Sequence, residues 1–122
     1  MANLAITEIK SFIPSKDFDI SQRFYQALGF EVASVFGDVA YMRKDNTAFL
    51  LQNYYQVEHA ENTMMHLLVE DAMGWLEHVK ASSVEKDFEC KVTELIEQPW
   101  GMLEFCLTDP SGVLWRVAQN IR

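Results

Sequence analysis

The sequence predicts an α+β protein with a single domain, residues 1–122, built from two βαβββ modules over approximately residues 4–53 and 63–120. Three observations predict this fold class. Strand-like and helix-like patterns follow the same order in both halves, an aspartate precedes each predicted helix, and a polar hairpin turn lies near the end of each half. A chain of 122 residues is long enough to bury one hydrophobic core without cross-links.

The first half begins with a predicted strand over residues 6–13, where apolar and polar residues roughly alternate, and Pro14 ends this strand. Asp17 or Asp19 offers an N-cap for the helix that follows, and Gly29 stops this helix. Apolar residues at helical spacing define its buried face: Ile20, Phe24, Ala27 and Leu28. Strands over residues 30–35, 39–43 and 47–53 follow, separated by polar turns at 37–38 and 45–46.

The second half repeats this order after a polar linker at residues 54–62. A strand over 64–69 leads to a helix that Asp71 can cap, that carries Met73, Leu76 and Val79, and that ends at the serines 82–83. Residues 88–95 alternate weakly, and strands over 101–108 and 113–119 flank a turn at 109–112. Two such modules side by side can form a curved sheet half-barrel around a cavity, which is one of several topologies compatible with the pattern.

The composition points to a protein without nucleic-acid or membrane partners. The net charge is −8, whereas nucleic acids and anionic membranes require a basic surface. The acidity is compatible with a cationic ligand, and equally with a role in solubility. The chain has no apolar run long enough for a membrane span, and we expect no secretory signal. Cys90 and Cys106 do not form a CxxC pair, so a reducing, cytoplasmic location is expected.

Two stretches of sequence resemble a known superfamily. The first is PSKDFDISQRFYQALGF at residues 14–30, and the second is EQPWG at 97–101, followed by Glu104-Phe105 and DPSG at 109–112. Together they resemble the vicinal oxygen chelate superfamily, which comprises glyoxalases, bleomycin-resistance proteins and dioxygenases. The EQPWG stretch is more particular to the bleomycin-resistance proteins. The resemblance implies the two-module half-barrel around a cavity, and a homodimer.

The metalloenzymes of this superfamily bind a divalent metal with His and Glu from four strands, and the matched positions here are Lys10, Leu50, Met64 and Arg116. Lysine and arginine are cations without a free lone pair, leucine has no donor atom, and a thioether suits copper(I). A shift by two residues brings in a scattered set: Glu8, Gln52 and His66. We therefore expect neither a metal nor another cofactor.

The resemblance also assigns a ligand-stacking role to Trp100, although a loop tryptophan can instead pack on the core. If the Glu104 side chain points into the predicted cavity, it would recognise a cationic group or a hydrogen-bond donor of the ligand. If it points outward, it would be a solvated charge. A lone histidine such as His66 is more often structural than functional. No residue is expected to be catalytic. The predicted ligand-binding residues are Phe12, Tyr41, Gln52, His66, Trp100, Glu104, Trp115 and Arg116, of which Phe12 and Trp115 are also core candidates.

The acidic and aromatic pair that follows the LGF motif in bleomycin-resistance proteins is replaced here by Ala33 and Ser34, which argues against bleomycin itself. The leading hypothesis is a metal-independent protein that sequesters a flat, partly apolar small molecule at a dimer cleft, with cationic molecules and antibiotics included among the expected ligands. The alternatives are a glyoxalase- or dioxygenase-like enzyme, a metal-free enzyme with His66 or Glu104 as general base, and an interaction protein whose cavity is filled by its own side chains.

Overall fold

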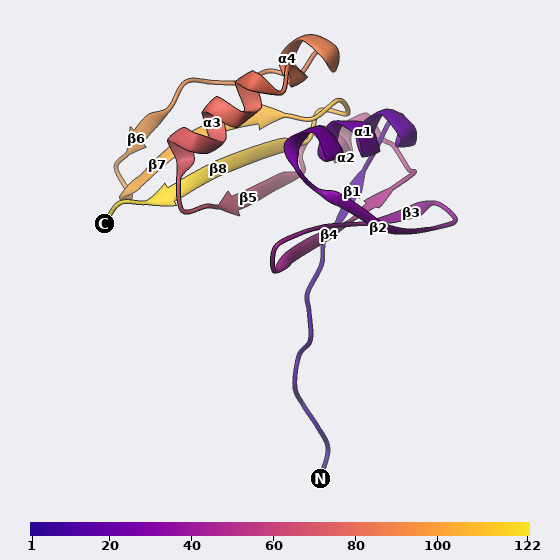
Figure 1. Ribbon diagram of the computed structural model, residues 1–122. Coiled ribbons are helices and arrows are strands. Elements are labelled where there is room, and N and C mark those ends of the chain that lie inside the picture. Colours follow the sequence, from indigo (N-terminus) through magenta and orange to yellow (C-terminus); the bar gives the residue numbers. More distant parts are fainter.

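Two four-stranded sheets form the framework of the computed structural model, which describes all 122 residues (Figure 1). The first sheet contains β1 (Phe12–Pro14), β2 (Glu31–Phe36), β3 (Val39–Lys44) and β4 (Thr47–Gln52) in the order β1-β4-β3-β2. The second contains β5 (Met64–Leu68), β6 (Ile96–Gln98), β7 (Met102–Thr108) and β8 (Leu114–Asn120) in the order β5-β8-β7-β6. In each sheet one parallel pair, β1 with β4 and β5 with β8, is joined by antiparallel neighbours. The predicted α+β class with two modules is confirmed.

The two main helices begin at the predicted caps. The Asp17 carboxylate accepts a hydrogen bond from the Ile20 N–H at the start of α1 (Phe18–Leu28), and Gly29 ends that helix with a φ of 111°. Such a left-handed conformation favours glycine. Asp71 likewise accepts from a backbone N–H at the start of α3 (Ala72–Ala81). The periodicity expected on α3 holds only in part, because Val79 is buried whereas Met73 is exposed.

Two short helices and the position of one strand differ from the sequence-based expectation. The predicted linker contains α2 (Val57–Glu61), whose Ala60 side chain is fully buried, and α4 (Val84–Asp87) follows α3. Residues 88–95 form no strand and make only an isolated bridge to β7. Glu89 has a φ of 55°, outside the extended region, and the edge strand β6 is confined to Ile96–Gln98.

The N-terminal segment, residues 1–11, extends away from the body of the molecule (Figure 1). The predicted strand over 6–13 is therefore wrong for most of its length, since only Phe12–Pro14 pair with β4. A strand needs a neighbouring backbone to hydrogen-bond with, and the residues before Ser11 have none in this chain. Leu4, Ile6 and Ile9 are consequently exposed.

One core joins the two modules between the helices and the sheets. Tyr25, Phe30 and Phe49 of the first module pack against Trp115 of the second, with ring centroids 5.4–6.1 Å from that indole. The Tyr25 hydroxyl donates to the Asp109 carboxylate at 2.5 Å and accepts from the Trp115 Nε1–H at 2.9 Å. Burial raises the pKa of Tyr25 well above 10, so the hydroxyl keeps its proton.

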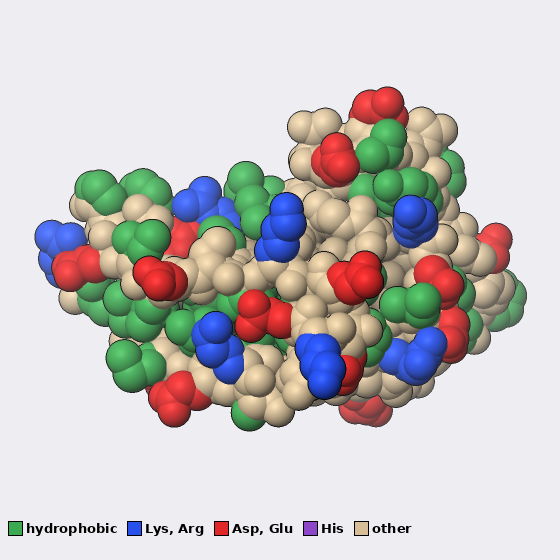
Figure 2. Space-filling model, turned by 90° about the horizontal axis from the view of Figure 1, so that it is seen from above, with side chains coloured by type: hydrophobic (Ala, Val, Ile, Leu, Met, Phe, Trp, Pro, Cys, Tyr) green, Lys and Arg blue, Asp and Glu red, His purple; other side chains and the backbone are tan.

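Helices cover one side of both sheets and leave the other side open, toward the direction in which the N-terminal segment runs (Figure 1). On the helix-bearing side, acidic and basic side chains are interspersed (Figure 2). None of the helices combines the length and the apolar character needed to cross a bilayer.

Candidate functional site

The open face of the first sheet carries three of the predicted site residues. Phe12 lies opposite Leu50, and Leu50 lies opposite Tyr41, so these three side chains form a row across the strands. Gln52 follows Leu50 by two residues and therefore lies on the same face. The alternate residues of these strands, such as Leu51, are buried in the core. Phe12 is half exposed.

The end of the N-terminal segment lies against this face. The Glu8 carboxylate accepts from the Lys10 ammonium at 2.5 Å and from the Tyr41 hydroxyl at 3.1 Å. The hydrogen bond with Lys10 lowers the pKa of Glu8 and raises that of Lys10, because each charge favours the other. A cavity of about 390 Å³ opens beside this pair, lined by Lys10, Tyr41, Leu50, Ser34, Phe36 and Val39.

The open face of the second sheet carries a stacked polar set. Arg116 lies opposite His66 on β5 and opposite Cys106 on β7. Its Nε and Nη2 atoms donate to the two carboxylate oxygens of Glu104, whose side chain is only 2% exposed. The hydrogen bond with Glu104 raises the pKa of Arg116. The Trp100 ring lies over the guanidinium, with its centroid 5.7 Å from Cζ.

This arrangement does not fit a divalent metal. Arg116, at one matched ligand position, is held in the ion pair with Glu104, and Lys10, at another, is paired with Glu8. The remaining two matched side chains, Leu50 and Met64, offer no oxygen or nitrogen donor. The structure brings together no group of three or more His, Cys, Asp or Glu side chains suited to holding a metal ion.

The structure thus brings the predicted site residues together in two sets. Phe12, Tyr41 and Gln52 share the first open face, and His66, Glu104 and Arg116 share the second with Trp100 beside them. Trp115 instead points into the core and is 5% exposed, although it lines a cavity of about 290 Å³ at the module junction together with His66. No cavity within the single chain is lined by Trp100, Glu104 or Arg116.

Sequence reasoning missed two partners on these faces. Glu8 supports Tyr41 from the N-terminal segment, and no local pattern links two residues so far apart in the chain. Cys106 lies beside Arg116 on the second open face, where burial raises its pKa. The alternation of β7 could have indicated this position, since Cys106 follows Glu104 by two residues.

Comparisons with known proteins agree with this fold. A family model described as the Glyoxalase/Bleomycin resistance protein/Dioxygenase superfamily matches residues 6–117. No curated protein matches the chain in sequence. A bleomycin resistance determinant encoded on the transposon Tn5 superimposes with a TM-score of 0.82 at 22% identity, covering 93% of this chain and 98% of that one.

Two further solved structures show the range of functions on this fold. The bleomycin-binding protein from Streptomyces verticillus, complexed with copper(II)-bleomycin, has a TM-score of 0.77 at 21% identity, covering 98% and 99% of the two chains. Lactoylglutathione lyase from Agrobacterium tumefaciens has a TM-score of 0.66 at 18% identity, covering 97% and 95%. With the family model matched over nearly the whole sequence, the chain belongs to the glyoxalase/bleomycin resistance protein/dioxygenase superfamily.

Proposed function

We propose that this protein is a cytoplasmic, metal-independent homodimer that binds a flat, partly apolar organic molecule, antibiotics included, in clefts between two copies of the chain. The observation that carries the proposal is the division of the candidate residues into two open faces, neither of which encloses a cavity around Trp100. The first open face of one copy against the second open face of another would enclose a ligand between them. The similar fold of the bleomycin-binding protein from Streptomyces verticillus supports this reading.

Exposed apolar side chains support the presence of a second copy. Phe36 on the first open face is 91% exposed, and Met64 and Trp100 on or beside the second are 57% and 59% exposed. Large exposed apolar patches mark surfaces that bind a partner or a ligand, and the half-exposed Phe12 lies on the same open face as Phe36. An extended segment of eleven residues reaches about 36 Å, so the N-terminal segment is long enough to lie across a neighbouring copy.

The charges of both faces support selection of the ligand by shape rather than by net charge. Glu104 is committed to Arg116, and Glu8 to Lys10, so each open face presents a balanced ion pair. The accessible recognition element is the Trp100 ring, stacked on the Arg116 guanidinium. A flat ligand placed on this ring gains stacking of about 0.5–1.5 kcal/mol beyond the area that it buries.

Titration with a panel of flat molecules tests the binding proposal. Bleomycin, cationic dyes and neutral aromatic compounds are added to the full chain, and tryptophan fluorescence is followed. We expect quenching by bleomycin and the cationic dyes that Trp100→Phe abolishes and that the matched variant Trp75→Phe, whose indole lies on the helix-bearing side, retains. Binding of no member of the panel would overturn the proposal.

The oligomeric state is tested by light scattering after gel filtration. We expect twice the 14.1 kDa mass of one chain, and a shift toward the monomer when residues 1–11 are deleted. A monomeric full chain would contradict the dimer, and with it the cleft.

Two alternatives make different predictions in the same experiments. A metal-dependent enzyme of the lactoylglutathione lyase type would contain stoichiometric metal by elemental analysis, which we do not expect because the donor set does not fit. An interaction protein without a ligand is favoured by the lack of a cavity beneath Trp100 in one chain. That alternative predicts a dimer that binds no member of the panel.

A further inference from the structure

A cavity of about 340 Å³ lies on the helix-bearing side, between the end of α1 and the beginning of α3. Its volume is within the range of small-molecule sites. Leu28, Gly29 and Lys44 line it from the first module, and Asp71, Trp75 and His78 contribute from the second. None of these residues belongs to the two open faces.

Contacts between the modules hold this cavity in shape. The His78 Nε2–H donates to the Leu28 carbonyl oxygen at 2.9 Å, across 50 residues of sequence. That carbonyl lies in the last turn of α1, where carbonyl oxygens have no backbone N–H of the same helix to accept from. The Trp75 ring meets the His78 ring edge to face, with centroids 5.7 Å apart and planes at 88°. The indole is therefore held in place before any ligand arrives.

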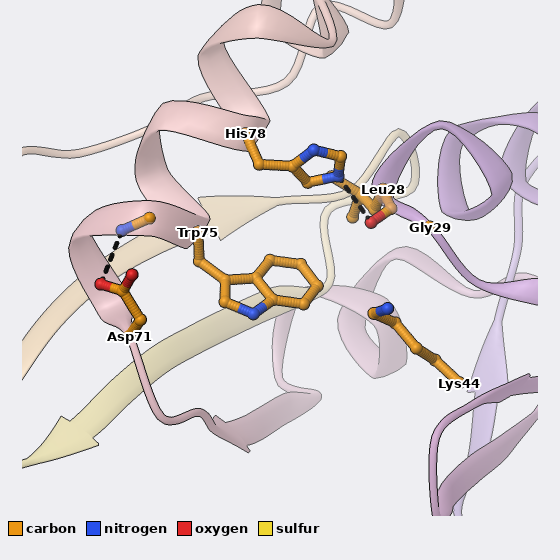
Figure 3. Close-up of a pocket in the computed structure, with 7 residues that line it drawn as sticks. Leu28, Gly29, Lys44, Asp71, Trp75 and His78 are labelled. Atoms are coloured by element: carbon orange, nitrogen blue, oxygen red, sulfur yellow. Dashed lines mark hydrogen bonds between the residues drawn. The ribbon is translucent and has the colours of Figure 1, made fainter.

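The Trp75 indole and the Lys44 ammonium face one another across the cavity (Figure 3). The Lys44 Nζ lies 5.9 Å from the centre of the indole ring. Its one ion pair is with Asp45, at 3.9 Å, and the Asp45 side chain is 84% exposed. The Trp75 Nε1–H donates no hydrogen bond in the structure. An aromatic surface beside a weakly paired cation is complementary to a flat molecule that carries a negative charge.

Asp71 lies on the other side of the indole from Lys44 (Figure 3) and would orient such a molecule. Its Oδ1 accepts from the Gly74 N–H at 2.9 Å, so part of its charge is offset at the N-terminus of α3. A ligand carboxylate is repelled from this end of the cavity and attracted to the Lys44 end. The Lys44 stem passes close to Gly29, since a Cβ added to this glycine would lie 3.7 Å from Lys44 Cε, and the Lys44 side chain stays 33% exposed.

We infer that this cavity is a second ligand site, which binds flat aromatic carboxylates with the ring on Trp75 and the carboxylate on Lys44. The site is independent of the proposed dimer cleft, because it shares no residue with either open face.

Nuclear magnetic resonance of the indole N–H groups tests this inference on the full chain, with Trp75→Phe assigning the Trp75 resonance. Three probes of similar size are titrated: 1-naphthoate, neutral 1-naphthamide and cationic 1-naphthylmethylamine. We expect 1-naphthoate to bind most tightly and to move the Trp75 resonance saturably. Lys44→Gln should weaken 1-naphthoate about fivefold, the effect of losing one partly exposed ion pair, and leave 1-naphthamide unchanged.

Two control variants separate this site from other effects. Lys80→Gln removes another exposed charge from the end of α3 and should leave the affinity for 1-naphthoate unchanged. Trp100→Phe, which tests the dimer cleft, should also leave it unchanged, so the two proposals can fail separately. A Trp75 resonance that does not move, equal affinity for the amide, or tighter binding of the amine would each overturn the inference.

Discussion

Replacing Tyr25 with phenylalanine tests the polar link between the two modules. The Tyr25 hydroxyl donates to Asp109 Oδ2 and accepts from the Trp115 Nε1–H, and all three residues are at most 5% exposed. Tyr25→Phe keeps the ring and its aromatic contacts but removes both hydrogen bonds. The Trp115 N–H is then buried without an acceptor, and Asp109 Oδ2 loses its donor.

The expected loss of stability follows from these two orphaned groups. A buried polar group without a partner costs about 1–3 kcal/mol. Asp109 Oδ1 still accepts from the Ser111 and Val113 N–H groups at 2.8 and 2.9 Å, which limits the cost at the carboxylate. We expect Tyr25→Phe to lower the free energy of unfolding by about 3 kcal/mol, or the melting temperature by about 10 °C. Urea unfolding followed by circular dichroism, at one fixed protein concentration, measures this loss.

Tyr41→Phe is the matched control. The Tyr41 hydroxyl also bonds a carboxylate, that of Glu8 at 3.1 Å, but this contact is at the surface. Its loss should cost less than about 0.5 kcal/mol, as for most surface substitutions. The reasoning is refuted if the two variants lose equal stability, or if Tyr25→Phe loses less than about 1 kcal/mol.

Three further predictions concern single side chains. Arg116→Met leaves the buried Glu104 carboxylate unpaired and should lower the free energy of unfolding in urea by about 3 kcal/mol. Adding Glu104→Leu should recover most of this loss, and an equal loss in the double variant would contradict the prediction. Burial raises the pKa of the Cys90 thiol to about 11. The rate of its reaction with a disulfide reagent should therefore rise about tenfold per pH unit from pH 8 to 10, and a rate that does not change with pH would contradict this. Gly74→Ala should not gain the ~1 kcal/mol that helix propensity offers, because the new Cβ would clash with Asp71 Oδ2. Measured against Asp71→Ala, the same Gly74→Ala change should gain stability in urea unfolding, and equal effects in both backgrounds would contradict this.

The sequence predicted an element correctly where residues within that element determine its start and its end. The capping residues Asp17 and Gly29 and the apolar spacing between them are sufficient for α1, because all three act within the helix. The α2 helix was missed because five residues with a single buried side chain, Ala60, produce no periodic pattern. The N-terminal strand was predicted too long because alternation reports amphipathic character, whereas a strand also requires a neighbour.

The face of a strand on which a candidate residue lies could be predicted in part from the sequence, but the partner of its side chain could not. Alternation along the strand predicts that Gln52 shares the face of Leu50, and in the structure both lie on the first open face. For Glu104 the sequence left the direction of the side chain open. The pairing of Glu104 with Arg116 depends on the register of β7 against β8, which local sequence does not specify. Trp115 and Arg116 are neighbours on β8 and point to opposite faces, so Trp115 lies in the core because Arg116 lies on the open face.

The two hydrogen bonds of the Tyr25 hydroxyl also mean that the two modules cannot replace one another. Tyr25 lies eight residues after the Asp17 cap, and the same count from Asp71 reaches Val79, which has no hydroxyl. Two copies of the first module would lack Asp109, and two copies of the second would set a valine methyl against its carboxylate. The halves have therefore diverged into complementary parts, and a chain assembled from identical halves would lose this joint.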